Sequence, residues 1–338
     1  MAQTNTMEVT PDRLLGLGLS MAASVAMRAA VELDLFTKIG EGIGTAAGLA
    51  SACGASEKGI RVLSDFMTIQ GFLEKSDGTY RLTAESAAFL DRRSPAFMGS
   101  IFLFLAAPGH LKAMEDVTGA VRKGGSVLEH ESVEDNNPMW VTFAEAMAPM
   151  MAKPAEFIAR RVGPLGGDQM RVLDIAAGHG LFGIAFASAY PSARVTGLDW
   201  AAVLEVAKKN AAKSGVSDRY STIPGSAFEV DLGGPYDVVL LPNFLHHFDH
   251  ATNVGLLKRI RAALKPGGVI ATLEFVPNDD RVTPPGAGTF AMTMLLSTAR
   301  GDAYTFKELA AMMSEAGFSQ NEAVPLPAGP QTLVLSRV

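Results

Sequence analysis

The sequence predicts an α/β protein in which a helical first part precedes a mostly parallel sheet that ends in an antiparallel hairpin. Up to about residue 90, alanine and leucine recur at helical spacing, and β-branched runs are few. After residue 169, short β-branched runs alternate with helical stretches, as in a parallel sheet covered by helices on both faces. The last two runs are joined by only P-A-G-P, which is too short for a crossover helix, so they must pair antiparallel.

The first part is expected to be a winged helix-turn-helix over residues 1–95. Ser56 is a favourable N-cap, and apolar residues at Ile60, Leu63 and Met67 follow it at helical spacing. Two short runs then flank Asp77-Gly78, which is a strong hairpin signal.

A second helical region, rich in methionine and phenylalanine, is expected over residues 96–165, with G-P-L-G-G-D at 163–168 as a linker. The sheet domain is expected over residues 166–338. Its predicted strands are 171–175, 194–199, 220–223, 236–241, 268–275, 321–326 and 331–338, and its predicted helices are 181–190, 201–213, 250–264 and 305–316.

Composition excludes several classes of protein. A chain of 338 residues with 48% hydrophobic and 19% charged residues has ample core and is not disordered. Its single cysteine, Cys53, excludes an intrachain disulfide and a cysteine-rich zinc site. The N-terminus lacks the pattern of a secretory signal, and the apolar run at 101–107 is too short to span a bilayer, so we expect a cytoplasmic protein with no membrane partner.

Charge argues against nucleic-acid binding, although a winged helix is also a DNA-binding fold. The net charge is −6, and residues 1–100 hold nine Lys or Arg against eleven Asp or Glu. In the helix that would enter a groove, Lys58 and Arg61 are offset by Glu57 and Asp65. A DNA-binding domain should carry a basic stripe.

The stretch V-L-D-I-A-A-G-H-G-L-F-G at 172–183 raises the question of which cofactor is bound. Gly178, Gly180 and Gly183 form G-x-G-x-x-G, and Asp199 follows at the spacing of a dinucleotide site. An NAD-dependent oxidoreductase is therefore one hypothesis. However, the carboxylate of Asp174 just before the turn would repel a pyrophosphate, and the terminal hairpin replaces a second mononucleotide-binding half. These features favour S-adenosylmethionine, whose sulfonium and ammonium groups are cationic.

Residues at the strand ends are the candidate cofactor ligands. Asp199 could accept hydrogen bonds from a ribose diol, or instead cap the helix at 201–213. Trp200 could lie against the adenine or shield the start of that helix. Asp174 is expected near the methionine ammonium group. Asn243 follows the fourth strand, either beside the cofactor or as a turn residue.

L-H-H-F-D-H at 245–250 supplies candidate bases. A phenol loses its proton only near pH ~10, and histidine is the side chain best suited to remove it at neutral pH. His246 and His247 are the alternatives for this role. His246 and His250 also stand four apart, as zinc ligands can, but no third ligand has suitable spacing, so no metal is expected.

Taken together, the motifs resemble those of the small-molecule O-methyltransferases of the caffeate and hydroxyneurosporene type. The resemblance covers nearly the whole chain and rests on V-L-D-I-A-A-G-H-G, V-T-G-L-D-W, L-P-N-F-L-H-H-F-D-H, L-K-P-G-G, T-L-E-F-V-P-N-D-D and G-D-A-Y-T-F-K-E-L, in this order. It implies a Rossmann-like class I methyltransferase domain that uses S-adenosylmethionine, preceded by a winged-helix dimerisation domain. The resemblance also implies a homodimer, a hydroxylated acceptor of the aromatic kind, and metal-independent O-methylation.

The resemblance also implies roles for individual residues. His246 matches the general base, and Glu274 matches an acidic residue beside it. Ser226 stands where the family usually has an acidic residue that contacts adenine, and Ala227 and Phe228 continue this cofactor loop. Phe143, Met147 and Met294 match positions that face the acceptor, although such stretches are more often plain core.

One motif departs from the family. Plant members carry a second catalytic glutamate in G-x-E-R-T, whereas this chain has G-D-A-Y-T, with Ala303 at the matching position and Asp302 one residue earlier. A relative with non-methylating chemistry, or a winged-helix regulator that senses a small molecule, remain the alternatives to a methyltransferase.

Overall fold

The computed structural model describes residues 10–19, 22–128, 139–167, 169–327 and 329–338. Its contacts divide the chain into two compact units, Met1–Pro108 and Gly109–Val338. This division differs from the three parts expected from the sequence, because the helical stretch before the sheet belongs mostly to the second unit.

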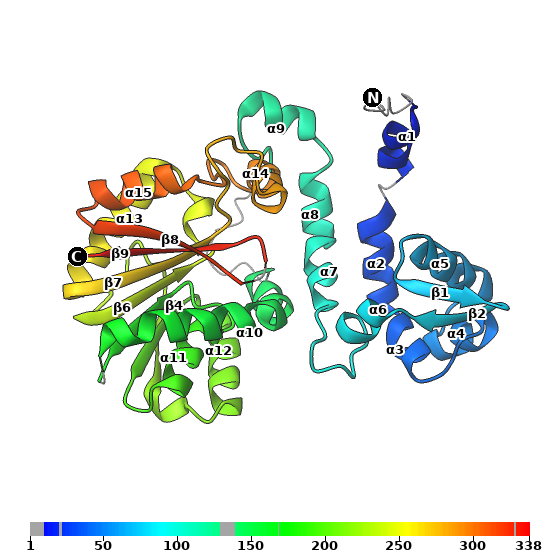
Figure 1. Cartoon of the computed structure of the whole chain (residues 1–338), viewed down its shortest axis with the longest axis horizontal. Helices are drawn as coiled ribbons and strands as arrows, with labels where there is room; N and C mark the ends of the chain where they lie inside the picture. The colour runs from blue at the N-terminus through cyan, green and yellow to red at the C-terminus, as the bar shows by residue number, and fades with distance from the viewer. Residues whose placement is uncertain (1–9, 20–21, 129–138, 168, 328) are drawn as a thin grey trace, which may run out of the picture. The chain divides into compact units, whose positions relative to one another are not determined.

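The first unit is a helical domain with a small hairpin (Figure 1). The predicted cap at Ser56 is confirmed, since its Oγ accepts the Gly59 N–H at 3.1 Å. The predicted hairpin is also confirmed: Ser76 pairs with Thr79 across a two-residue turn in which Asp77 and Gly78 both have positive φ. The elements are α1 (Asp12–Leu19), α2 (Ala23–Glu32), α3 (Leu35–Gly40), α4 (Ala46–Cys53), α5 (Glu57–Ile69), β1 (Leu73–Ser76), β2 (Thr79–Leu82), α6 (Ala84–Phe89) and α7 (Ser100–Leu105).

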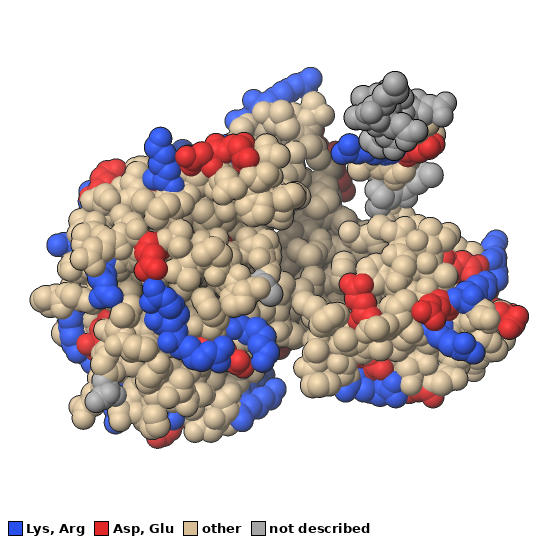
Figure 2. Space-filling model, viewed as in Figure 1, with Lys and Arg blue, Asp and Glu red and all other residues tan. Residues whose placement is uncertain are grey.

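Two of the four charged residues of α5, Arg61 and Asp65, take part in ion pairs on the helix and with the hairpin. Arg61 and Lys75 both form ion pairs with Asp65, at 3.1 and 2.5 Å. Figure 2 shows Lys and Arg interspersed with Asp and Glu on the visible face. The pairing offsets the charge of Arg61 on the helix that a DNA-binding winged helix would present to a groove.

The second unit is built around a seven-stranded sheet of order β5-β4-β3-β6-β7-β9-β8. The first five strands in this order are parallel, and β9 runs antiparallel to both of its neighbours, as the sequence predicts. The strands are β3 (Arg171–Ile175), β4 (Arg194–Asp199), β5 (Tyr220–Pro224), β6 (Tyr236–Pro242), β7 (Leu264–Glu274), β8 (Ser319–Pro325) and β9 (Thr332–Arg337).

Helices cover both faces of this sheet, with α10, α11 and α12 on one side and α13 and α15 on the other (Figure 1). The two apolar layers are separate clusters, which is the expected doubly covered arrangement for a parallel sheet. The helices are α8 (Pro108–Ala113), α9 (Val117–Lys123), α10 (Met139–Gly166), α11 (Leu181–Ala189), α12 (Ala201–Lys213), α13 (His250–Ala263), α14 (Pro285–Ser297) and α15 (Phe306–Glu315), with short 3₁₀ turns η2 (Ser217–Arg219) and η3 (Leu245–His247).

The linker predicted at 163–168 is wrong for its first four residues, because α10 continues to Gly166 through three internal prolines. The helix buries Ala155, Ile158 and Val162 in the core layer shared with α11. Burial of this face outweighs the local preference of Gly and Pro for loops. Residue 168 of that segment, and 129–138 of the predicted helical region, lie outside the described residues.

Among the described residues, no single helix is long and apolar enough to cross a membrane. One bent pair, Asp12–Gly18 with Ala23–Glu32, passes this test on length and composition alone.

Candidate active site

Parallel strands bring the candidate residues to one edge of the sheet. The strands β4, β3, β6 and β7 lie side by side in this order and run parallel. Their carboxyl ends therefore lie at the same edge of the sheet. Asp199 and Glu274 are the last residues of β4 and β7, and Asn243 directly follows β6. In open sheets of this kind, ligands bind outside the carboxyl ends of the strands.

The glycine turn after β3 is open at one position and closed at another. Gly178 has a φ of 55°, and a Cβ there would meet nothing nearer than the Ala176 carbonyl oxygen at 3.8 Å. At Gly180 a Cβ would lie 2.8 Å from that of Ala207 and 3.0 Å from the Tyr220 hydroxyl. Gly180 therefore serves close packing under the turn, whereas Gly178 leaves space at its surface.

Asp199 is tied to this turn. Its Oδ2 accepts the Gly178 N–H at 2.8 Å, and its Oδ1 accepts the Trp200 N–H at 2.7 Å. Burial raises the pKa of Asp199 to about 6, against the opposing effect of these two backbone hydrogen bonds. The helix α12 has Trp200, not Asp199, as its N-cap residue. Because each oxygen uses only one acceptor site, the carboxylate keeps capacity for ligand hydroxyls.

Asp174 lies behind the turn and has no exposed surface. Its Oδ2 accepts the Gly183 N–H at 2.9 Å, which holds the first turn of α11. Its Oδ1 is enclosed and has no partner among the described residues, and burial raises the pKa of Asp174 to about 8. The expected contact with the cofactor ammonium group stays a prediction.

The loop after β5 joins the same edge. The Gly225 N–H donates to the Asp199 carbonyl oxygen at 2.9 Å. The Ser226 hydroxyl accepts the Phe228 N–H at 3.2 Å, so it shapes the loop, and Ala227 between them is buried. The Phe228 ring lies edge-on to Phe248 with centroids 4.9 Å apart. The predicted cofactor loop is therefore placed next to Asp199, and its contact with adenine stays a prediction.

Asn243 links three parts of the second unit. It has a φ of 55°, and its N–H donates to the Leu273 carbonyl oxygen at 2.7 Å. Its side-chain Oδ1 accepts a hydrogen bond from Gln331, and its Nδ2 lies 3.7 Å from the Met151 sulfur. These bonds pin the β6 end to β7, β9 and α10. The loop that follows is thereby turned across the end of β7.

That turn places the imidazole of His246 beside the carboxylate of Glu274. The His246 Nδ1 lies 2.5 Å from Glu274 Oε2, and both side chains are buried. The other carboxylate oxygen, Oε1, accepts the N–H groups of Phe244 and Leu245 at 3.0 and 2.8 Å. A carboxylate fixed in this way keeps the Nδ1 proton on the imidazole and leaves Nε2 as the basic nitrogen.

His247 has a different environment from His246. Its ring centroid is 4.4 Å from that of His246, and Trp140 packs edge-on against it at 5.6 Å. Burial, and secondarily the neighbouring His246, hold the pKa of His247 well below its usual value. His247 has no carboxylate partner among the described residues, so of the two it is the less suited to act as the base.

The predicted acceptor residues occupy the two helices that flank the histidines. On α10, Phe143 is edge-on to Trp140 at 5.4 Å, and Met147 is one turn further along. On α14, Met294 is buried and lies one turn from Phe290, whose ring is 4.8 Å from His246. Residues four apart share a helix face, so each helix presents one aromatic ring and one methionine together.

Sequence reasoning missed Trp140 and Phe290 as individual residues, because they stood inside stretches that also fit a plain core. It also missed Gly301. A Cβ at Gly301 would lie 2.2 Å from the His246 carbonyl oxygen, and the next N–H, of Asp302, donates to that oxygen at 3.0 Å. The close approach of Gly301 to His246 was signalled only by the G-D-A-Y-T motif.

The displaced acidic residue of that motif does not reach the imidazole. The carboxylate of Asp302 pairs with Arg281 at 3.1 Å, and the matching position, Ala303, is buried. His250 pairs with Glu315 at 2.9 Å on an exposed surface. Within the described part of the chain, no three His, Cys, Asp or Glu residues are grouped as metal ligands.

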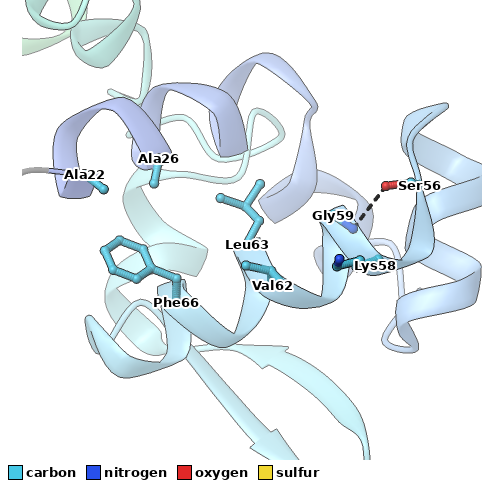
Figure 3. Close-up of a pocket in the computed structure, with 8 residues that line it drawn as sticks. All are labelled: Ala22, Ala26, Ser56, Lys58, Gly59, Val62, Leu63 and Phe66. Atoms are coloured by element: carbon cyan, nitrogen blue, oxygen red, sulfur yellow. Dashed lines mark hydrogen bonds between the residues drawn. The ribbon is translucent and has the colours of Figure 1, made fainter.

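A concavity lies in the first unit, between α2 and α5 (Figure 3). Ala22, Ala26, Val62, Leu63 and Phe66 make most of its lining, which is apolar. None of the catalytic residue types found at the sheet edge occurs there, so it is a surface feature of this unit and not a second candidate active site.

Comparisons with known proteins agree with one another. Family models described as an O-methyltransferase domain and an O-methyltransferase dimerisation domain match residues 168–319 and 16–92. The chain is 30% identical over 323 residues to the mitomycin biosynthesis 6-O-methyltransferase of Streptomyces lavendulae, covering 91% of this chain and 89% of that relative. It is 29% identical over 318 residues to the 3-hydroxy-5-methyl-1-naphthoate 3-O-methyltransferase of Streptomyces sahachiroi, covering 93% and 91%.

Solved structures with a similar fold include methyltransferases as well. A candidate O-methyltransferase from Nostoc punctiforme PCC 73102 is 47% identical, with a TM-score of 0.93 and coverage of 98% of this chain and 100% of that one. Human N-acetylserotonin methyltransferase, solved in complex with S-adenosylmethionine, is 23% identical and shares the fold, with a TM-score of 0.85 over 100% and 99% of the two chains.

Proposed function

The chain belongs to the small-molecule O-methyltransferases that use S-adenosylmethionine, and we propose that it methylates an aromatic hydroxyl group with His246 as general base. The observation that carries the proposal is the buried pair of His246 and Glu274 at the sheet edge that also holds the open glycine turn.

The residues at the β3 and β4 ends suit this cofactor. The space at Gly178 lets a ligand approach the backbone, and Asp199 has acceptor sites left for a ribose diol. The loop Ser226–Phe228 and the side chains of Trp200 and Asn243 would complete the site. When bound, S-adenosylmethionine supplies a methyl group activated by a positively charged sulfur.

His246 removes the acceptor proton at Nε2. Glu274 holds the imidazole in the required tautomer and stabilises the imidazolium that forms, because its carboxylate is already fixed by two backbone N–H groups. Proton removal by a positioned base contributes about 10²–10⁴-fold in rate.

The surrounding rings favour a flat acceptor. Phe290 stacks on Phe275 with centroids 3.9 Å apart and meets His246 edge-on, while Trp140 and Phe143 stand on the α10 side. Apolar aromatic walls exclude water and position a planar ring, and positioning supplies much of the remaining acceleration.

A substrate panel tests the proposal. The protein is incubated with S-adenosylmethionine and phenols, hydroxynaphthoates and hydroxyquinones, and S-adenosylhomocysteine release is measured by chromatography. Methyl ethers of aromatic hydroxyls, identified by NMR, are the expected products. Methylation confined to nitrogen, to carboxylates or to aliphatic alcohols would contradict the proposed acceptor class.

We also propose a homodimer formed through the first unit, which matches the dimerisation domain. Leu14 and Leu15 on α1 are 72% and 58% exposed, which is unfavourable unless a partner covers them. Sedimentation should detect a dimer that Leu14→Glu weakens, and a monomeric wild type would contradict the proposal. The cytoplasmic location expected from the sequence stays a prediction.

A further inference from the structure

The short turn that carries His246 is bonded to other parts of the second unit through its N–H groups and also through its carbonyl groups. The N–H groups of Phe244 and Leu245 donate to Glu274, as described above. The carbonyl groups accept hydrogen bonds from other segments, which the pairing of the imidazole with the carboxylate does not explain. Because the carbonyls at the end of a helical turn have no partner within it, these outside donors determine how the turn is held.

The amide of Asn253 is the first of these donors. Its Nδ2 donates to the carbonyl oxygens of Leu245 at 2.9 Å and Phe248 at 3.2 Å, the residues on either side of the two histidines. Asn253 has no exposed surface and lies in the first turn of α13, where its N–H donates to the Asp249 carbonyl oxygen at 3.0 Å. Since the helix holds the amide, both carbonyls are fixed relative to α13.

The G-D-A-Y-T motif supplies two further donors. The Asp302 N–H donates to the His246 carbonyl oxygen at 3.0 Å. The Tyr304 hydroxyl donates to the Phe248 carbonyl oxygen at 2.5 Å. Tyr304 directly precedes Thr305, the N-cap residue of α15, which forms a capping box there. The tyrosine is therefore held at the start of a well-capped helix.

The motif thus contacts the base by a route other than a second carboxylate. Ala303, at the position of the family's second glutamate, is buried, and the Asp302 carboxylate pairs with Arg281. What reaches the turn is the main-chain N–H of Asp302 and the side chain of Tyr304, and both bond to backbone oxygens. The motif therefore bears on the position of the turn and not directly on the imidazole.

We propose that Asn253 and Tyr304 are positioning residues, which hold the carbonyl groups of the turn and so keep the imidazole of His246 beside Glu274. The inference rests on the proposed function of His246 and adds to it the residues that determine where the base lies. A turn held only through its N–H groups would pivot about Glu274. A displacement of about 1 Å at a reacting group lowers the rate by up to about 10²-fold.

Tyr304→Phe tests the inference with the loss of a single hydroxyl. The ring that remains still packs against the apolar layer beneath α13 and α15. With the acceptor that gives the highest turnover in the substrate panel, kcat should fall about tenfold. The KM for this acceptor and the dissociation constant of S-adenosylhomocysteine should stay within about twofold, because the hydroxyl is bonded to Phe248 and the cofactor residues are unchanged.

Tyr236→Phe is the matched control. The Tyr236 hydroxyl also donates to a main-chain carbonyl, that of Leu232, at 2.8 Å, and its side chain is buried. Tyr236 is the first residue of β6, whereas the base follows the end of this strand. Both variants should lower the Tm by about 2–4 °C, but only Tyr304→Phe should lower kcat. Wild-type kcat in Tyr304→Phe, or equal losses of kcat in the two variants, would overturn the inference.

Asn253→Ser tests the other donor. A serine hydroxyl is too short to reach both carbonyl groups, so kcat should fall further than in Tyr304→Phe, again with little change in KM. A folded Asn253→Ser protein with wild-type kcat would overturn the role of the amide. If this buried replacement prevents folding, Tyr304→Phe and its control decide alone.

Nuclear magnetic resonance separates this inference from the proposed function. An imidazole proton that is hydrogen-bonded to a carboxylate gives a far-downfield signal, which histidine labelled with nitrogen-15 reports without any acceptor, and His246→Ala assigns it. The signal should persist in Tyr236→Phe and broaden or move upfield in Tyr304→Phe. If His246→Ala is active, the proposed base is wrong, but this signal still decides whether the turn is held as proposed. No such signal in the wild type, or an unchanged one in Tyr304→Phe, overturns the inference.

Discussion

Two carboxylates at the same sheet edge accept two backbone N–H groups each, but they distribute them differently. Asp199 at the end of β4 takes one on each oxygen, from Gly178 and Trp200. Glu274 at the end of β7 takes both on Oε1, which leaves Oε2 for the imidazole of His246. The same strand-end position therefore gives one carboxylate with an acceptor site left on each oxygen, which we propose binds the cofactor, and one with a whole oxygen left for an imidazole, which we propose positions the base.

The largest effect is expected for His246→Ala. Turnover should fall by about 10³-fold, since among the described residues no other basic side chain is hydrogen-bonded to Glu274 and could accept the proton. Affinity for S-adenosylhomocysteine, measured by calorimetry, should stay within about threefold, because Asp199 and the glycine turn are untouched. An active His246→Ala enzyme would show that another residue is the base.

Glu274→Gln should lower kcat by about 10²-fold. The amide oxygen can still accept the N–H groups of Phe244 and Leu245, so the fold of the loop is retained, while the negative charge next to the imidazolium is lost. The comparison with Asp302→Asn, a carboxylate paired with Arg281 away from the imidazole, serves as a control that should keep nearly full activity. Equal losses in both variants would argue for a general charge effect.

Asp199→Asn is expected to have the opposite kinetic signature. The dissociation constant for S-adenosylhomocysteine should rise about tenfold, the equivalent of about one good hydrogen bond to a charged acceptor, while kcat at saturating cofactor stays nearly constant. Isothermal titration and steady-state kinetics measure the two quantities separately. A fall in kcat alone would contradict the division of roles between the two carboxylates.

The last effect is on stability and not on turnover, and it concerns Asp174. Burial raises its pKa in the folded protein to about 8 from an ordinary 3.8, so between these values the folded state holds a proton that the unfolded state has released. Stability conferred by this group is therefore present at low pH and is lost as pH rises toward 8, by at most about 1.4 kcal/mol per pH unit.

Asp174→Asn keeps an oxygen for the Gly183 N–H and has no such titration. In thermal unfolding of the cofactor-free proteins, the Tm of the variant should rise relative to the Tm of the wild type between pH 5 and pH 8. A difference that does not change with pH would mean that Asp174 is ionised in the folded state.

Local chemistry made much of this fold predictable. The N-cap at Ser56, the turn at Asp77-Gly78 and the alternation of strands and helices after residue 169 depend on residues close in sequence. The antiparallel end of the sheet followed from the short P-A-G-P connection, which β8 and β9 confirm. The position of the candidate site residues at one edge of the sheet was also predictable, since the parallel topology brings the strand ends together.

Contacts between distant segments were beyond the sequence. Trp140 meets His247 from a helix that starts more than a hundred positions earlier, and no periodicity indicates this pairing. α10 continues through Gly163 and Pro164 because its buried face outweighs their local preference. The complete burial of Asp174 was also not predictable, because whether a strand-end side chain is exposed depends on packing under the turn.

The position of the aromatic residues has a practical consequence. The chain contains two tryptophans, and both pack against the same small apolar cluster of Ala144, Val203 and Val206, at the point where α10 meets α12. Trp140 also meets His247, and Trp200 directly follows Asp199. Intrinsic emission should therefore report ligand binding at this junction without a label, and single Trp→Phe replacements would show how much each indole contributes to the signal.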